Sequence, residues 1–288
     1  DAQESRGLGD VYKRQAQVAG TAAFSKFVHL LQLVADRDTA MTVAELCKVS
    51  GYPRPTVYRT VYALIAEGLL SESVVSGRLE LGPRLIQLAN RSWKRSDLRL
   101  LAMADLTRLR DITGETVHLA VPNADQMVYI EKLESPKAVR MTSRVGTSVA
   151  MHSSSVGKAY LAFLDEAPRE QLLRELPQPW KVFTPQTLTD VAALRVQLER
   201  YRERGWAIDD EEQEAGIRCF GAPIFGKQGA PVACISVSTL LFRQEEDVQR
   251  KYVAPLLEAC RSISRLLQDT PASYSACLLY TSPSPRDS

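Results

Sequence analysis

Apolar residues recur at helical spacing in the first part of the chain. The first such run predicts a helix over 23–35, with the apolar positions Phe24, Phe27, Val28, Leu31 and Val34. A second, shorter helix is predicted after Thr42, because Glu45 three residues later completes the pattern of a capping box. Gly51 is expected to end this helix.

A third helix and a hairpin are predicted next. Pro55 suits the first turn of a helix, which is expected to end before Gly68. The strand-like runs LLSESVV and GRLELG then join through Ser76 and Gly77, a hairpin signal. The order helix, helix, turn, helix, hairpin predicts a winged helix-turn-helix domain over 20–82.

The pattern changes in the second part of the chain. A linker helix is expected over 83–95, and Ser96 and Asp97 would cap a long amphipathic helix that runs through Ile112 in a domain spanning 96–270. Strands are predicted at 116–121, 126–133, 138–143, 216–225 and 230–239, and further helices at 154–164, 168–176, 189–204 and 244–267, the last with a kink or break at Pro255. These elements predict an α+β domain with a mostly antiparallel sheet.

The composition is that of a globular protein. The 288 residues are 45% hydrophobic and carry a net charge of +2, and no apolar run is long enough for a membrane span. Five scattered cysteines favour reduced thiols in the cytoplasm over a disulfide framework. Three dispersed histidines disfavour a metal site, and nothing in the sequence indicates a cofactor.

The two ends of the chain are unusual. SRGLGDVYKRQ, residues 5–15, and CLLYTSPSPR, residues 277–286, can be encoded by opposite strands of one DNA sequence that resembles a sequencing adapter. Residues 1–15 and 277–288 are therefore expected to be adapter-derived and not to belong to the fold.

The third predicted helix carries the clearest chemistry of the first domain. Its apolar stripe, which would pack on the domain, consists of Val57, Val61, Leu64 and Ile65. Side chains on the other face would reach base edges in the major groove of double-stranded DNA, and Arg78, expected at the tip of the hairpin, would contact the phosphate backbone. The candidate DNA contacts on the helix are Arg54, Thr56, Tyr58, Arg59 and Thr60. For the helix alone, an ordinary solvated face is the alternative.

Six motifs follow in order along the second part: GETVHLAV, YIEKLES, VRMTSRVG, HSSSVGKAYLAFL, RGWAIDDEEQEAGIRCFGAPIF and ACISVS. Together with the winged helix, they closely resemble the IclR family of bacterial transcription regulators over about 23–268. The resemblance implies a GAF- or profilin-like effector-binding domain, a small organic acid as effector, and homodimers or homotetramers on operator DNA.

Two features favour a ligand site in the second domain. A helix that begins in HSSSVG would offer free backbone N–H groups to an anion such as a carboxylate. The candidates are Ser154, Ser155, Val156 and Gly157, with plain N-capping by a serine as the alternative. In CISVS, Ser236 and Ser238 share one face of an apolar strand, so their hydroxyls need a partner from a ligand, the backbone or water.

Asp209 and Cys219 lie in a stretch that is first acidic and then apolar. The resemblance implies that both line the effector pocket, although a cysteine alone would also suit a small core position. Met141 and His118 are further candidates, and a satisfied histidine within the sheet is the alternative for His118. The remaining acids are expected in a solvated turn, with some of them engaging Arg218: Asp210, Glu211, Glu212 and Glu214.

A carboxylate effector beside Asp209 would meet a like charge, unless one group is protonated or the effector presents a hydroxyl there. We therefore expect a hydroxy acid, keto acid or sugar acid, with its carboxylate near Ser155. The predicted function is a ligand-responsive regulator of a catabolic operon, as either activator or repressor. One rival is a hydrolytic enzyme acting on a small acid with an appended DNA-binding domain, and another is a DNA-binding protein without a ligand.

Overall fold

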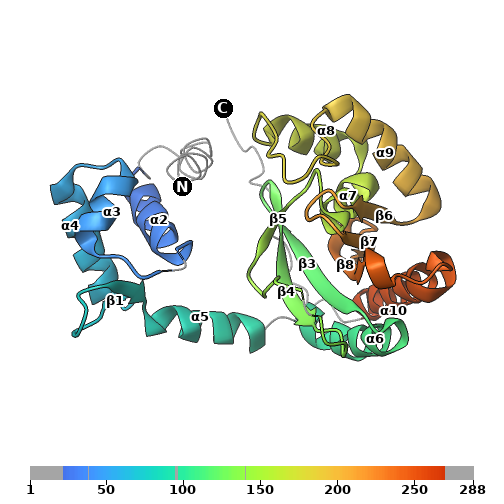
Figure 1. The fold of residues 1–288 in the computed structure, drawn as a ribbon, viewed down its shortest axis with the longest axis horizontal. Coiled ribbons are helices and arrows are strands. Elements are labelled where there is room, and N and C mark those ends of the chain that lie inside the picture. The colour runs from blue at the N-terminus through green and yellow to red at the C-terminus, as the bar shows by residue number, and fades with distance from the viewer. Residues whose placement is uncertain (1–21, 38, 95–96, 140, 270–288) are drawn as a thin grey trace. The chain divides into compact units, whose positions relative to one another are not determined.

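The computed structural model describes residues 22–37, 39–94, 97–139 and 141–269 (Figure 1). The chain divides between Arg95 and Ser96 into two compact units, so the predicted linker helix belongs to the first unit. The adapter-like ends, 1–15 and 277–288, and the predicted capping by Ser96 and the Asp97 side chain lie outside the described residues. Across the described ranges, no helix combines the length and the apolar character needed to cross a membrane.

The first unit has the predicted winged helix-turn-helix order. Its described elements are α2 (Ala22–Ala35), α3 (Val43–Ser50), α4 (Arg54–Ala66), β1 (Leu70–Glu72), β2 (Leu79–Leu81) and α5 (Pro83–Lys94). The core that joins α2, α3 and α4 to the hairpin includes the buried side chains of Leu30, Leu46, Val57, Val61 and Leu70. The predicted apolar stripe of α4 is buried at Val57, Val61 and Leu64. In α2 the pattern is only partly right, because Phe24 and Val28 are exposed.

Local signals set the helix ends in this unit. The Glu45 N–H donates to the Thr42 hydroxyl at 3.3 Å, and the Thr42 N–H donates to the Glu45 carboxylate at 2.8 Å, which confirms the capping box. Gly51 follows α3 with a φ of 70°, and Gly68 follows α4 with a φ of 69°. Glycine adopts this left-handed conformation without a steric penalty, so both helices end where predicted.

The hairpin has shorter strands and a longer turn than predicted. The turn spans Ser73 to Arg78, where the Ser73 N–H donates to the Arg78 carbonyl at 2.9 Å. Val74 and Val75 are fully exposed in this turn. Arg78 lies at the end of the turn, next to β2, and not at its tip.

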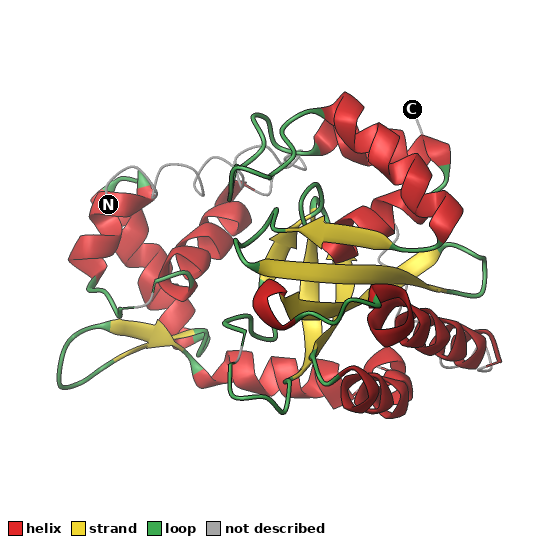
Figure 2. Ribbon diagram, turned by 45° about the vertical axis from the view of Figure 1, so that its right-hand side comes forward, coloured by secondary structure: helices red, strands yellow, loops and turns green. Residues whose placement is uncertain are grey.

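The second unit is an antiparallel sheet with helices on both faces (Figure 2). Its described elements are α6 (Asp97–Thr113), β3 (Thr116–Asn123), β4 (Gln126–Leu133), β5 (Ser148–Ala150), α7 (Ser155–Phe163), α8 (Glu166–Glu175), α9 (Val191–Arg204), β6 (Ala207–Asp210), β7 (Ile217–Phe225), β8 (Pro231–Leu240), the turns η1 (Leu241–Arg243) and η2 (Gln249–Val253), and α10 (Ala254–Asp269). The strand order is β5-β4-β3-β8-β7-β6. The predicted α+β class is confirmed.

The two faces of this sheet bury different side chains. Phe220, Ile235 and Val237 pack with α6 and α10 in one core. Ala120 and Cys234 belong to a second core on the other face, with α7, α8 and α9. The alternation predicted for the strand CISVS is therefore confirmed.

The segment 138–143, predicted as a strand, is a loop in its described residues, and the edge strand is β5. The Lys132 ammonium donates hydrogen bonds to the carbonyls of Met141 at 2.9 Å and Ser143 at 2.7 Å. A side chain, and not a neighbouring strand, thus satisfies this stretch of backbone, which the alternating pattern could not indicate.

The final helix begins later than predicted. Gln244, the expected first residue, follows the 3-10 turn η1, and helical conformation starts at Val248. The π-helical turn η2 leads directly into α10, and Pro255 lies in the first turn of α10. The wider π turn accommodates the proline where a kink or break was expected.

Candidate functional site

Most of the predicted DNA-contacting side chains lie on the surface of α4. Arg54 and Arg59 are exposed, and Thr56 and Tyr58 are half-buried. The ring of the half-buried Tyr58 lies 6.3 Å from the ring of Tyr62, which is exposed. The first half of α4 therefore offers two guanidinium groups, a hydroxyl and a phenol, which are suitable donors for base edges and phosphates.

Thr60 is the exception, and its predicted place on the exposed face is wrong. Its side chain is only 4% exposed. Val57, Thr60, Val61 and Leu64 follow the spacing i, i+3, i+4 and i+7, and all four are buried. Thr60 therefore belongs to the apolar stripe, and its hydroxyl does not face a DNA-binding surface.

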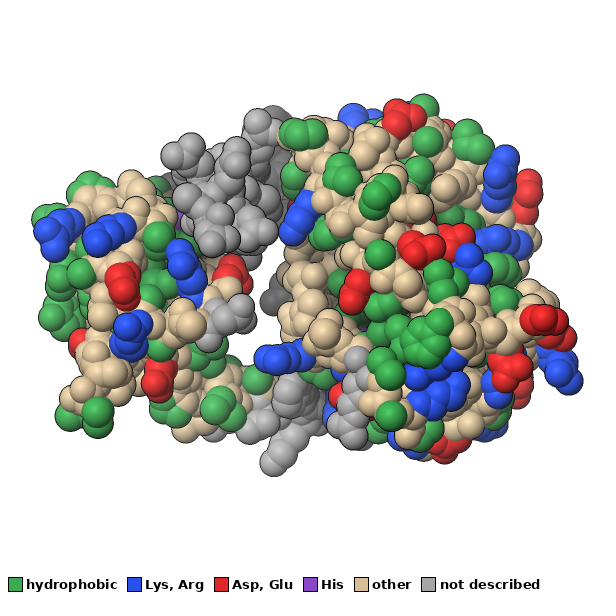
Figure 3. All heavy atoms as spheres, in the orientation of Figure 1, with side chains coloured by type: hydrophobic (Ala, Val, Ile, Leu, Met, Phe, Trp, Pro, Cys, Tyr) green, Lys and Arg blue, Asp and Glu red, His purple; other side chains and the backbone are tan. Residues whose placement is uncertain are grey.

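Arg78 is engaged within its own unit. Its Nη1 donates to the Ala40 carbonyl and lies 3.8 Å from the Glu45 carboxylate. Figure 3 shows acidic and basic side chains interspersed on the visible face of this unit. A phosphate contact by Arg78 would therefore compete with Glu45.

In the second unit, polar side chains gather on the sheet face opposite α6 and α10. His118 Nδ1 lies 3.4 Å from the Ser236 hydroxyl and 3.5 Å from the Ser238 hydroxyl, and its Nε2 lies 2.8 Å from the Ser143 hydroxyl. His118, Ser236 and Ser238 are all buried. Burial, assisted by the charge of Lys132, lowers the pKa of His118 to about 3, so the imidazole is neutral.

Tyr129 and Cys219 extend this polar cluster. The Tyr129 ring stacks on His118 with centroids 4.3 Å apart, and the Cys219 thiol donates to the Ser238 hydroxyl at 3.1 Å. Burial, followed by the charge of Asp209, raises the pKa of the thiol. Burial likewise raises the pKa of Tyr129. Both groups are therefore neutral donors, and a protonated thiol is a poor nucleophile.

Asp209 closes the cluster from β6, where it pairs in register with Cys219. Its carboxylate accepts hydrogen bonds from the N–H groups of Glu212 at 2.8 Å and Gln213 at 3.2 Å. Burial raises the pKa of Asp209 to about 7, against the opposing effect of Lys158. Near neutral pH, this carboxyl group therefore exists in both its protonated and its ionised form.

The prediction that Glu212 lies in a solvated turn is wrong. Glu212 is 5% exposed, and its carboxylate accepts a hydrogen bond from the fully buried Lys158. The Lys158 ammonium also lies 5.6 Å from the centre of the Tyr201 ring. Asp210, by contrast, pairs with Arg218 at 2.7 Å, as expected for the acidic stretch.

The start of α7 combines a cap with two available N–H groups. The Ser154 hydroxyl accepts from the Gly157 N–H at 3.1 Å and donates to the Ala150 carbonyl at 2.7 Å, so Ser154 is an N-cap. Within the described ranges, the N–H groups of Ser155 and Val156 donate no backbone hydrogen bond. These two are therefore the ones in the first turn that can receive an anion.

A close backbone contact holds the start of α7 against β7. A Cβ atom on Gly221 would lie 2.5 Å from the Ser155 carbonyl oxygen. Gly221 pairs with Ser236 in the sheet. The first turn of α7 therefore lies beside the serines of the polar cluster.

Tyr129 and Ser143 were not singled out from the sequence, and Lys158 was not expected to belong to the site. A lysine among the apolar positions of VGKAYLA was a usable signal, because a buried lysine needs a partner. Ser143 had no such signal, since its loop resembled a strand. Met141, which was predicted to line the pocket, lies half-buried in the loop that also carries Ser143.

Within the described residues, no group of histidine, cysteine, aspartate or glutamate side chains could hold a metal ion. A cavity of about 700 Å³ lies apart from the polar cluster, between α10 and β7.

The winged helix-turn-helix unit and the sheet unit with its buried polar cluster define a DNA-binding transcription regulator. The sequence model of the IclR helix-turn-helix domain family matches residues 24–73. The sequence model of the bacterial transcriptional regulator IclR C-terminal family matches residues 90–265. The chain belongs to the IclR family of bacterial transcription regulators.

Three known proteins illustrate this relationship. XynR of Escherichia coli is 30% identical over 83% of this chain and 94% of its own length, and KdgR of Escherichia coli is 32% identical over 83% and 90%. An IclR homologue from Microbacterium hydrocarbonoxydans, crystallised with 4-hydroxybenzoate, is 26% identical with a TM-score of 0.73 and covers 86% of this chain and 100% of its own. XynR and KdgR are named HTH-type transcriptional regulators, so the rival prediction of a hydrolytic enzyme is wrong.

Proposed function

We propose that this regulator senses a hydroxy acid, keto acid or sugar acid in the polar cluster and controls a catabolic operon in response. One observation carries the proposal: hydrogen-bonding side chains are buried together on the sheet beside the start of α7. His118, Ser236, Ser238 and Tyr129 supply neutral groups, and Asp209 supplies a carboxyl group that titrates near neutrality. Cys219 and Met141 are proposed as further contacts.

The charges around the cluster favour a particular orientation of the effector. Lys158 is bound to Glu212, Lys132 is bound to loop carbonyls, and His118 is neutral. A carboxylate would therefore take its hydrogen bonds from the Ser155 and Val156 N–H groups, while a hydroxyl would reach Asp209. The 4-hydroxybenzoate bound by the Microbacterium homologue carries a carboxylate and a hydroxyl, which supports this class of ligand.

On the DNA side, we propose that Arg54, Thr56, Tyr58 and Arg59 enter the major groove and that Arg78 contacts phosphate. A homodimer or homotetramer would present paired units to an operator, and the effector would shift the population of their arrangements. Gel-shift titrations on the intergenic DNA upstream of the gene, with and without candidate acids, test this. The proposal would be contradicted if none of the acids bound to the protein and none of them changed its affinity for the DNA.

The effector contact is tested by calorimetry with glycolate, pyruvate and gluconate as probes. We expect Asp209→Ala to weaken the binding of a hydroxylated acid at least tenfold. The matched control is Asp210→Ala, which changes the neighbouring carboxylate on the Arg218 side and should leave the affinity unchanged. Equal affinity in wild type and Asp209→Ala would rule out the contact.

A further inference from the structure

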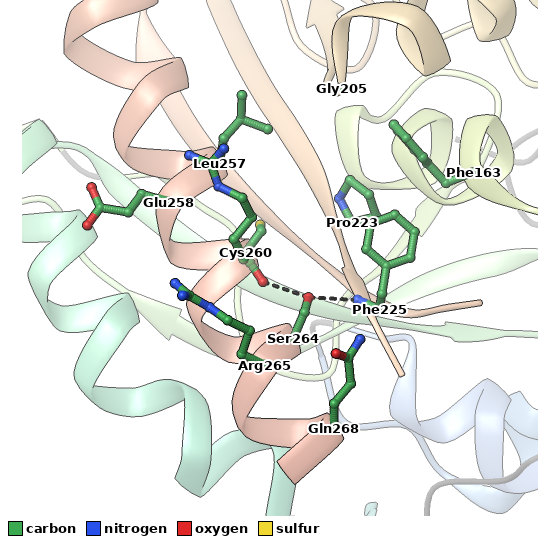
Figure 4. A pocket seen from close by; sticks show the side chains of 11 residues that line it. Phe163, Gly205, Pro223, Phe225, Leu257, Glu258, Cys260, Ser264, Arg265 and Gln268 are labelled. Atoms are coloured by element: carbon green, nitrogen blue, oxygen red, sulfur yellow. Dashed lines mark hydrogen bonds between the residues drawn. The ribbon is translucent and has the colours of Figure 1, made fainter. Parts of the chain in front are cut away.

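The cavity of about 700 Å³ in the second unit is lined by residues of α7, β7 and α10 and by Gly205, which follows α9 (Figure 4). Leu257 contributes to the wall formed by α10, and Pro223 and Phe225 come from the last residues of β7. Phe163, at the end of α7, meets Phe225 edge to face with ring centroids 5.7 Å apart. This volume lies in the range of small-molecule sites, which are mostly apolar with a few polar groups.

The polar atoms of the cavity floor are already satisfied by the protein. The Ser264 hydroxyl accepts a hydrogen bond from the Phe225 N–H at 2.9 Å and donates one to the Cys260 carbonyl at 2.7 Å. The Cys260 thiol lies 3.5 Å from the Ala222 carbonyl, and burial raises its pKa, so it carries no charge. The interior therefore favours an apolar group over a polar one.

The rim of the cavity is positively charged. Arg261 and Arg265 both line it and are exposed on α10, and neither forms an ion pair with any described residue. Glu258 is the acidic residue among the lining side chains. Because guanidinium groups bind carboxylates through charge-assisted hydrogen bonds, this rim complements an anion on an apolar body.

The cavity also shares elements with the polar cluster. Its walls include the far end of α7 and the far end of β7, whereas the near ends of the same elements carry Ser155 and Cys219. The Gly221–Ser155 contact joins the near end of α7 to the middle of β7. A ligand that changes the packing of α7 on β7 at one end therefore acts on the elements that form the other site.

The geometry points to a second ligand site at this cavity, for an apolar monocarboxylate such as an aromatic acid. Its ring packs between Leu257 and the two phenylalanines, and its carboxylate pairs with Arg261 or Arg265. This site is separate from the polar cluster, so its occupation does not depend on Asp209.

The test is calorimetry of the full chain with 2-naphthoate, with 2-naphthylmethanol as the uncharged analogue. We expect 2-naphthoate to bind more tightly than the alcohol. The double variant Arg261→Ala/Arg265→Ala should weaken 2-naphthoate binding at least tenfold, and Leu257→Trp, which places an indole where the naphthalene ring is proposed to pack, should abolish it. Arg250→Ala is the control, because its side chain is 87% exposed and does not line the cavity.

Three results would overturn the assignment. One is the absence of 2-naphthoate binding by the wild type. Another is binding that survives in the double arginine variant but disappears in Asp209→Ala, which would place the probe in the polar cluster. The third is a change in subunit number caused by Leu257→Trp in sedimentation experiments without any probe binding, which would make the cavity a subunit interface. If circular dichroism shows that Leu257→Trp does not fold, the double variant of the exposed arginines provides the test of the site.

Discussion

Polar side chains are exposed on the outer face of α4 but buried in the polar cluster on the sheet. On α4, Arg54 and Arg59 are exposed and come from one helix. In the cluster, His118 and Ser236 are buried, and their contact joins residues 118 positions apart. DNA that binds at α4 as proposed would displace water, whereas a ligand at the proposed effector site would have to replace hydrogen bonds that the protein already makes. The outer face of α4 can therefore contact a partner without losing internal hydrogen bonds. The polar cluster would accept only a ligand that matches its donors and acceptors.

The buried charge pair beneath the cluster gives the largest expected effect. Lys158→Met leaves the Glu212 carboxylate buried without its partner, which we expect to destabilise the protein by about 3–5 kcal/mol. Urea unfolding measures this. The double variant Lys158→Met/Glu212→Leu should recover most of the loss, because it removes both buried charges.

The exposed pair Arg195–Glu170 is the matched comparison, with nitrogen and oxygen 2.6 Å apart. Arg195→Met should cost less than about 1 kcal/mol, since both partners remain hydrated. Equal losses for Lys158→Met and Arg195→Met would show that burial does not distinguish the two regions.

The pH dependence of stability separates two members of the cluster. The pKa of Asp209 is raised from 3.8 to about 7 in the folded protein, so the folded state holds more protons between these values and stability falls as pH rises. The pKa of His118 is lowered from 6.5 to about 3, so the unfolded state holds more protons there and stability rises with pH. In the wild type, the two contributions oppose each other.

In Asp209→Asn, only the contribution of His118 remains, so the free energy of unfolding should rise with pH. In His118→Gln, only the contribution of Asp209 remains, so the free energy of unfolding should fall as pH rises. Each slope should reach up to about 1.4 kcal/mol per pH unit. Thermal unfolding of both variants between about pH 4 and pH 6.5 measures these slopes. The other titrating groups are the same in both variants, so they do not account for a difference between the slopes. The same slope in both variants would contradict these assignments.

The capping box of α3 gives a smaller effect, because it is a local and exposed interaction. Thr42→Ala removes the hydroxyl that accepts the Glu45 N–H. We expect a loss of about 1 kcal/mol in the stability of the first unit by chemical unfolding. Glu80→Ala, at an exposed position in β2, is the control and should change little.

The smallest effect on stability is expected on the outer face of α4. Arg59→Ala should change the stability by less than about 0.5 kcal/mol, because the side chain is exposed. The same substitution should weaken binding to the upstream DNA by about 1–3 kcal/mol in fluorescence anisotropy. Arg37→Ala, another exposed arginine in the same unit but outside α4, should weaken it less. If both variants bind equally well, α4 does not carry the predicted contact.

The sequence predicted those features whose partners lie close along the chain. Thr42 and Glu45 are three positions apart, and Ile235 and Val237 alternate with Ser236 and Ser238, so period and spacing were sufficient. Lys158 and Glu212 are 54 positions apart, and their contact depends on how α7 lies on β6 and β7. The pattern of one strand does not state which strand lies next to it, so Glu212 was predicted to be solvated. Thr60 was misplaced for another reason: a threonine within an apolar stripe resembles a polar residue at its border.

The contact between Gly221 and Ser155 has a consequence for redesigning the proposed effector site. The side chains of the cluster, such as Ser236 and Ser238, project from the sheet and can be exchanged to test which ligand the proposed site accepts. Residue 221 is different, since even a methyl group there would meet a backbone carbonyl of α7. A library that varies the pocket should therefore keep this glycine fixed, because any other residue changes the scaffold before it changes the specificity.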